Sequence, residues 1–150
     1  MIAYLDTSAL VKLYVFEEGT PRVKELVANS LMVATCKIAY AEARAALARG
    51  HRENALNDEL YTGAVVALKD DWRNYFTIEV SDTLIEQAGE LAAEHQLRGF
   101  DAVHLAAVLI LKQQVKENIT VACWDKRLWQ ALQAKAFTLL PEELPGSDTS

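Results

Sequence analysis

The stretch Met1-Ile-Ala-Tyr-Leu-Asp-Thr-Ser8 decides the fold of this 150-residue chain. Residues 2–5 form a short apolar run that stops abruptly at Asp6. This run is followed at once by Asp-Thr-Ser, and the combination predicts a buried strand that leads directly into a helix. The rest of the chain shows the same succession of a short apolar run and a helical segment.

Four further strands, and the helices between them, follow from the spacing of apolar residues. The expected strands are residues 31–34, 75–80, 119–123 and 137–140. The expected helices are residues 10–14, 20–29, 35–49, 57–72, 81–95, 101–114 and 125–134. Short strands separated by helices are typical of an α/β fold, so we predict a mostly parallel five-stranded sheet flanked by helices.

Local signals set the ends of two of these helices. Thr20 is expected to be the N-cap of one helix, with Pro21 as its first helical residue. Gly50 is expected to end the helix that starts at Thr35.

Length and composition indicate one cytoplasmic domain over residues 1–140, followed by a polar tail, residues 141–150, that is expected to be disordered. No segment approaches the roughly 20 apolar residues that span a bilayer, and no secretion signal is visible. Cys36 and Cys123 lie in apolar stretches and form no CxxC pattern, so buried free thiols are expected rather than a disulfide. The net charge of −6 argues mildly against nonspecific nucleic-acid binding, although the local distribution of charge must decide.

Three aspartates lie where an α/β protein places its ligands. Asp6 directly follows the first expected strand and Asp125 closely follows the fourth, and ligands bind beyond the carboxyl ends of such strands. Asp101 begins a helix that is expected to pack on the sheet. Each of the three has an equally plausible structural role, because Asp is a favoured N-cap and interacts well with the helix dipole.

Glu42 is different because it lies in the middle of the expected helix, among the small or apolar residues Ile38, Ala45 and Ala46. A charge on such a stripe is costly to bury unless it is paired or bound to a metal. Two alternatives stay open: the stripe is exposed to solvent, or a nearby arginine pairs with Glu42. The candidate arginines are Arg44, Arg49 and Arg52.

If the four carboxylates converge, they raise one another's pKa, and a divalent cation would remove that penalty. Oxygen-only ligands favour Mg²⁺ or Mn²⁺, and no His or Cys spacing offers a zinc site. His104 is expected to be a core or supporting residue rather than a ligand. Such a cluster suits attack of water on a phosphodiester. Ser8 could orient a ligand or a water, or it could simply form a turn.

Four segments together resemble the PIN-domain nucleases, and most closely the VapC-type toxins of toxin–antitoxin pairs. The segments are YLDTSAL (4–10), AYAEARAAL (39–47), LRGFDAVHLAA (97–107) and ACWDKRL (122–128). The resemblance implies a single PIN-like α/β domain and a Mg²⁺- or Mn²⁺-dependent endoribonuclease that acts on RNA. It also assigns metal-site roles to four acids, with Ser8 in support. The four acids are Asp6, Glu42, Asp101 and Asp125.

The resemblance further implies a homodimer and a small antitoxin that blocks the active site. Candidate interface residues, for each of which the sequence favours an ordinary place in the core, are Leu10, Leu13, Tyr14, Leu60 and Tyr61. Candidate RNA contacts, which could equally be ordinary surface residues, are Lys12, Arg44, Arg98, Lys126 and Arg127.

Two other functions remain possible. A phosphohydrolase of the haloacid-dehalogenase type also places an Asp after its first strand, but a second Asp follows two residues later, where this chain has Ser8. A non-catalytic PIN scaffold that only binds RNA or a protein would be expected to lack at least one of the four acids.

Overall fold

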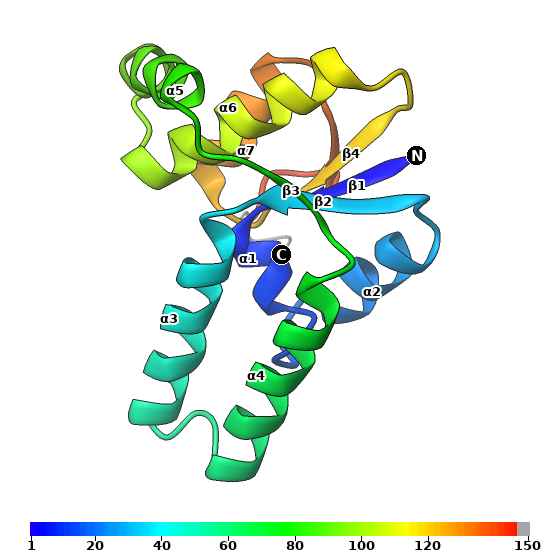
Figure 1. Cartoon of the computed structure of the whole chain (residues 1–150), viewed down its shortest axis with the longest axis vertical. Coiled ribbons are helices and arrows are strands. Elements are labelled where there is room, and N and C mark those ends of the chain that lie inside the picture. The colour runs from blue at the N-terminus through cyan, green and yellow to red at the C-terminus, as the bar shows by residue number, and fades with distance from the viewer. Residues whose placement is uncertain (147–150) are drawn as a thin grey trace.

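The computed structural model describes residues 1–146, in which five short strands alternate with seven helices (Figure 1). The strands are β1 (Ile2–Leu5), β2 (Met32–Cys36), β3 (Phe76–Ile78), β4 (Ile119–Ala122) and β5 (Thr138–Leu140). The helices are α1 (Thr7–Val11), α2 (Thr20–Ala28), α3 (Ala39–Arg52), α4 (Asp58–Trp72), α5 (Asp82–His95), α6 (Gly99–Gln114) and α7 (Lys126–Ala134).

The five strands form one sheet in which every pair of neighbours is parallel, in the order β3-β2-β1-β4-β5. β1 lies at the centre and all four of its residues are buried, as its continuous apolar run predicts. Leu5, the last residue of β1, pairs with Ala122, the last residue of β4. The predicted parallel five-stranded α/β fold is therefore confirmed.

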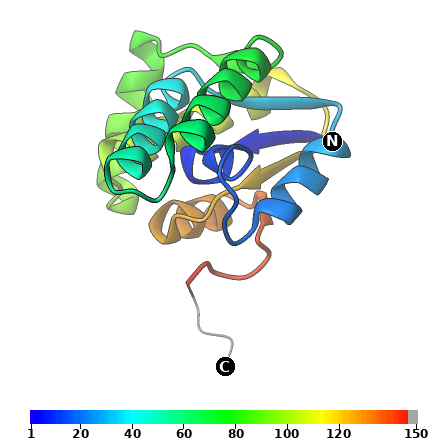
Figure 2. The same ribbon diagram turned by 90° about the horizontal axis from the view of Figure 1, so that it is seen from below.

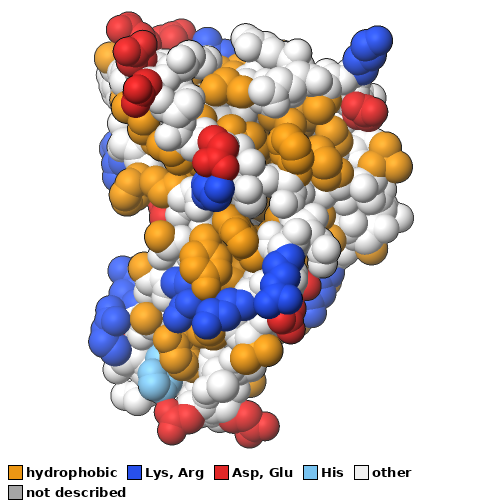
Figure 3. Space-filling view, viewed as in Figure 1, with side chains coloured by type: hydrophobic (Ala, Val, Ile, Leu, Met, Phe, Trp, Pro, Cys, Tyr) orange, Lys and Arg blue, Asp and Glu red, His pale blue; other side chains and the backbone are white. Residues whose placement is uncertain are grey.

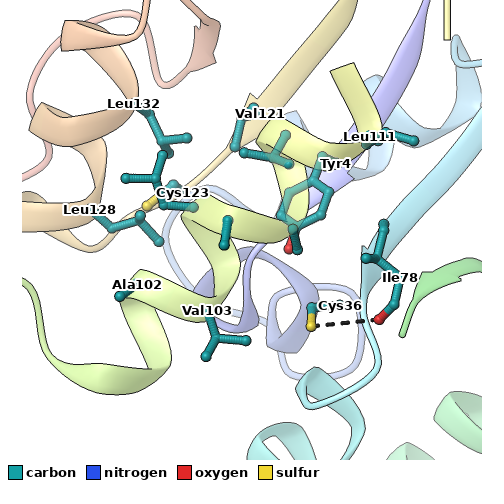
Figure 4. Packing of buried hydrophobic residues seen from close by; sticks show 14 of the residues in the cluster. Tyr4, Cys36, Ile78, Ala102, Val103, Leu111, Val121, Cys123, Leu128 and Leu132 are labelled. Carbon is teal, nitrogen blue, oxygen red and sulfur yellow. Dashed lines mark hydrogen bonds between the residues drawn. The ribbon is translucent and has the colours of Figure 1, made fainter. Parts of the chain in front are cut away.

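Helices cover both faces of the sheet (Figures 1 and 2). On one face, α5, α6 and α7 pack over a core that includes Tyr4, Val121 and Leu132 (Figure 4). On the other face, α1, α3 and α4 enclose a second core around Leu5, Leu10 and other buried side chains. α3 and α4 lie side by side and extend away from the sheet as a helical hairpin (Figure 1).

The predicted bounds of the helix over residues 35–49 are wrong at both ends. Thr35 belongs to β2, where its hydroxyl donates a hydrogen bond to the Leu5 carbonyl oxygen at 2.7 Å, a placement that suits a β-branched residue. α3 begins only at Ala39 and continues through Gly50 to Arg52. The chain leaves the helix where Asn54 adopts a left-handed conformation (φ 62°), the role that Gly50 was expected to fill.

The expected N-cap of α2 is also wrong by one residue. Gly19 precedes the helix, with Thr20 as its first residue and Pro21 as its second. Gly19 has φ 90°, and a Cβ atom there would lie 2.5 Å from the ring of Trp124, so only glycine fits. The Thr20 hydroxyl instead joins the preceding turn, donating to the Lys12 carbonyl oxygen and accepting from the Glu17 N–H.

The segment expected to be a disordered tail makes several contacts in its first part. The Trp129 indole donates a hydrogen bond to the Pro141 carbonyl oxygen, and Arg22 pairs with Glu142. Residues 147–150 of that predicted tail lie outside the described residues. Cys36 and Cys123 are buried free thiols, as predicted. Among residues 1–146, no helix has the length and apolarity needed to cross a membrane.

Candidate active site

The candidate site lies where the strand order reverses on either side of β1. β1 pairs with β2 on one side and with β4 on the other, and such a switch point is the usual ligand site of an open parallel sheet. Asp6 follows β1, and its N–H donates to the Ala122 carbonyl oxygen at the end of β4. The first loop of the chain and the loop after β4 therefore meet here.

Asp6 is buried, with only 3% of its surface exposed, and the protein fixes its orientation. Its Oδ1 accepts hydrogen bonds from the Ser8 hydroxyl at 2.6 Å and from the Ala9 N–H at 2.9 Å. The Ser8 hydroxyl oxygen in turn accepts from the Trp124 N–H at 2.9 Å. Asp6 thus caps α1, and Ser8 ties its carboxylate to the loop after β4. Burial raises the pKa of Asp6, and these hydrogen bonds only partly offset that effect.

Asp101 does not cap a helix. α6 begins two residues earlier than predicted, at Gly99, so Asp101 lies inside the first turn. Its half-buried carboxylate contacts Arg98, with 3.4 Å between Nε and Oδ2. Burial raises the pKa of Asp101, and the nearby charges of Asp125 and Asp6 raise it further, while Arg98 opposes them.

Asp125 both caps α7 and binds Arg98. Its Oδ1 caps α7 by accepting a hydrogen bond from the Leu128 N–H at 2.9 Å. Its Oδ2 accepts a hydrogen bond from the Arg98 guanidinium at 3.1 Å. The capping role that the sequence suggested is therefore real, but it leaves the second carboxylate oxygen free to bind Arg98.

Glu42 lies in the first turn of α3 rather than in the middle of the helix, because the helix starts later than predicted. Its Oε1 accepts a hydrogen bond from the Thr7 hydroxyl at 2.6 Å and lies 3.1 Å from Nε2 of His104. No arginine pairs with Glu42 in the described chain, and Arg44 donates instead to the Tyr40 hydroxyl. Although burial raises the pKa of Glu42, the bonds from His104 and Thr7 outweigh it, so this pKa is lowered.

His104 is the supporting residue that the sequence suggested. The Tyr4 hydroxyl bonds its Nδ1 at 2.8 Å, and its Nε2 lies 3.1 Å from both Glu42 and Thr7. Because an ionised carboxylate only accepts, Nε2 carries the hydrogen that faces Glu42. No role was predicted for Thr7 or Tyr4, and the only signal for them in the sequence is their position within two residues of Asp6.

The donor atoms suit a hard divalent cation, because Asp6, Asp101 and Asp125 offer only carboxylate oxygens and their charges act on one another. Within residues 1–146, no three His, Cys, Asp or Glu side chains are already arranged around one point that could hold an ion. Side-chain movement would therefore have to accompany metal binding.

Comparison with known proteins decides the family. The PIN domain family matches residues 3–128, which is most of the chain. The chain belongs to the PIN-domain family. One curated relative, ribonuclease VapC45 of Mycobacterium tuberculosis (strain CDC 1551 / Oshkosh), is 34% identical over 95% of this chain and 97% of the relative.

Solved structures share the fold of this PIN domain at lower identity. M. tuberculosis VapC20, described as a Sarcin-Ricin loop cleaving toxin, superposes with a TM-score of 0.65 at 20% identity, covering 95% of this chain and 99% of that one. A toxin–antitoxin complex from Klebsiella pneumoniae gives a TM-score of 0.59 at 18% identity, covering 83% of this chain and 87% of that one. These likenesses support the same architecture.

Basic residues of the PIN domain differ in how available they are. Lys12 is buried, pairs with Glu17 and lies over the Trp124 ring, so it is not exposed for RNA as the sequence suggested. Lys126 and Arg127 are exposed directly after Asp125. Lys and Arg side chains also gather over α3 and α4 on the face seen in Figure 3, although the net charge is negative.

The candidate interface residues also differ in how exposed they are. Leu10 is fully buried in the core, which is the alternative that the sequence favoured for these residues. Leu60, on α4, is 58% exposed. The remaining candidates are half-buried: Leu13, Tyr14 and Tyr61.

Proposed function

We propose that this PIN domain is a Mg²⁺- or Mn²⁺-dependent endoribonuclease whose metal is held by Asp6, Asp101 and Asp125, with Glu42 completing the site. The observation that carries the proposal is the pair of carboxylates Asp101 and Asp125, which one arginine contacts at the switch point of a parallel sheet, where Asp6 follows the central strand. The family supports it, because a relative 34% identical over nearly its whole length bears the name ribonuclease.

A divalent ion at this site would lower the pKa of a water molecule and stabilise the charge that develops on a phosphodiester. The chain's own residues supply the orientation. Ser8 and the Ala9 N–H hold Asp6 so that its carboxylate cannot rotate freely. His104 and Thr7 keep Glu42 ionised at neutral pH, so that it stays a charged carboxylate. Glu42 and Asp101 line the same cavity, of about 470 Å³.

Cleavage of RNA by the purified protein tests this proposal. Single-stranded RNA should be cut in the presence of Mg²⁺ or Mn²⁺ and left intact after EDTA is added. Asp101→Asn should lose at least about a hundredfold in rate while it remains folded, because a metal ligand is lost. Asp58→Asn, which removes an exposed carboxylate at the start of α4, is the control and should cleave normally. Normal cleavage by Asp101→Asn would rule out this site.

We also propose that the protein is the toxin of a toxin–antitoxin pair, binds a small antitoxin and forms a homodimer. The support is its likeness to VapC relatives and to a toxin–antitoxin complex from K. pneumoniae. Expression of the chain alone should arrest growth, and Asp6→Asn should relieve the arrest. Co-expression with its antitoxin should give a stable complex. Light scattering on the isolated protein should give twice the chain mass, and a monomer would contradict the homodimer.

The two alternative functions make different predictions. A haloacid-dehalogenase-type enzyme would form an acyl phosphate on Asp6, but Oδ1 of Asp6 accepts from Ser8 and Ala9, and Ser8 stands where that class has its second Asp. Mass spectrometry should therefore find no phosphorylated Asp6. A non-catalytic scaffold would bind Mn²⁺ or RNA without ever cutting the RNA.

A further inference from the structure

Arg98 places one positive charge between two of the proposed metal ligands. Its Nη2 donates to Oδ2 of Asp125 at 3.1 Å, and its Nε lies 3.4 Å from Oδ2 of Asp101. The two acids belong to different elements, since Asp101 lies in the first turn of α6 and Asp125 caps α7. One guanidinium therefore links the two carboxylates across the site.

The exposure of the three side chains shows which partner can move. The side chain of Arg98 is 74% exposed, whereas those of Asp101 and Asp125 are only 18% and 24% exposed. Asp125 is also fixed by the Leu128 N–H. An exposed ion pair is weak and its long side chain readily adopts other conformations, so Arg98 can leave at little cost.

We propose that Arg98 is an internal counter-ion that competes with the divalent metal for Asp101 and Asp125, and that once displaced it binds a phosphate of the RNA. This inference rests on the proposed metal-dependent ribonuclease function. A metal and Arg98 cannot both neutralise the same Oδ2 atoms, so binding of one opposes binding of the other. Without a metal, Arg98 thereby offsets part of the repulsion between the two carboxylates.

The position of Arg98 also fits its second role. With Phe100, Glu42 and Asp101, it lines the cavity of about 470 Å³ beside the acids. The planar guanidinium can donate two parallel hydrogen bonds to phosphate oxygens, and here it stands at the edge of the site where a phosphodiester would be cut. Phe100 is 58% exposed beside it.

Calorimetric titration with MnCl₂, without RNA, tests the competition. Arg98→Gln should bind Mn²⁺ about two- to fivefold more tightly than wild type, the range expected when a solvent-exposed ion pair no longer competes. Arg127→Gln is the matched control, because it removes the same charge from an exposed residue two positions after Asp125. Its Mn²⁺ affinity should change less than that of Arg98→Gln.

An NMR measurement distinguishes displacement of the Arg98 side chain by the metal from simple electrostatic repulsion between the two. In a ¹H–¹⁵N spectrum, the Arg98 Nε–H signal should move when MgCl₂ is added, and the Arg127 signal should not. Equal Mn²⁺ affinities of wild type and Arg98→Gln, or an unmoved Arg98 signal at saturating Mg²⁺, would overturn the competition while leaving the metal site intact. If neither wild type nor Arg98→Gln binds Mn²⁺, both this inference and the proposed metal dependence fail.

Cleavage kinetics at saturating Mn²⁺ test the phosphate contact. Arg98→Gln should raise KM for single-stranded RNA severalfold with little change in kcat, and the slope of log KM against log salt should fall by about 0.7, the value of one phosphate contact on a single strand. Lys24→Gln, on the exposed side of α2, should leave both quantities unchanged. An unchanged KM and slope for Arg98→Gln would refute the phosphate contact.

Discussion

At the scale of single residues, the site combines carboxylates with opposite pKa shifts. Burial and neighbouring negative charges raise the pKa of Asp101, whereas His104 and Thr7 lower that of Glu42. Asp101 therefore destabilises the folded protein when it is ionised, and Glu42 is held in its ionised form. This difference matches a site in which a bound cation would stabilise ionised Asp101, whereas Glu42 already pairs with His104.

The raised pKa of Asp101 predicts that its removal stabilises the protein in a chelator. A carboxyl with a raised folded pKa binds its proton more tightly when folded, so stability is lost as pH rises from the unfolded pKa through the folded pKa. In EDTA at pH 7, thermal unfolding of Asp101→Asn should occur a few degrees above wild type, and the gap should close below about pH 4. Glu90→Gln, on α5, is the control. A lower melting temperature for Asp101→Asn at pH 7 would contradict this.

The buried bond between Tyr4 and His104 predicts a loss of stability in Tyr4→Phe. The variant keeps the ring in the core but leaves Nδ1 of His104 without its partner at 2.8 Å. A buried polar group left unsatisfied costs about 1–3 kcal/mol, which urea denaturation can measure. A change below about 0.5 kcal/mol, the range of ordinary surface substitutions, would show that the bond does not fix His104.

At the scale of elements, two glycines predict opposite effects of the same substitution. Gly63 lies within α4, and a Cβ there would meet no atom within 4 Å, so Gly63→Ala should stabilise the protein by about 0.5–1 kcal/mol. Gly19→Ala should destabilise it, because φ is 90° and the new methyl group would meet the Trp124 ring. Thermal unfolding of both variants checks the pair, and a stable Gly19→Ala would contradict the described turn before α2.

The elements also show where sequence patterns succeed and where they fail. Each predicted strand and helix has a counterpart, because burial of an apolar face imposes the period that the sequence displays, but the first helix lies at Thr7–Val11 rather than at residues 10–14. Their ends are less predictable. Gly50 looked like a helix end, but Asn54 takes the left-handed conformation and the helix continues past Arg49 to Arg52. Local signals compete at an end, and the tertiary contacts of Thr35 and Leu56 decide between them.

At the scale of the whole molecule, metal binding should stabilise the fold. A ligand that binds only the folded state raises stability in proportion to RT ln(1 + [L]/Kd). Millimolar MnCl₂ should therefore raise the melting temperature of wild type, and this increase should be absent in Asp101→Asn. An equal increase in both proteins would place the bound metal elsewhere. The cytoplasmic location and the extent of the domain over residues 1–140 stay predictions.

The sequence by itself determined the parallel α/β fold and the identity of the acids, because strand and helix periods and the acidic residue types are written directly in the chain. Only the tertiary structure decided how those acids are used. It showed that Asp101 caps nothing, that Glu42 pairs with His104 instead of an arginine, and that Arg98 joins Asp101 to Asp125. The Arg98–Asp125 and His104–Glu42 contacts span 27 and 62 residues, and such distant partners are set by how helices dock on the sheet rather than by any local pattern.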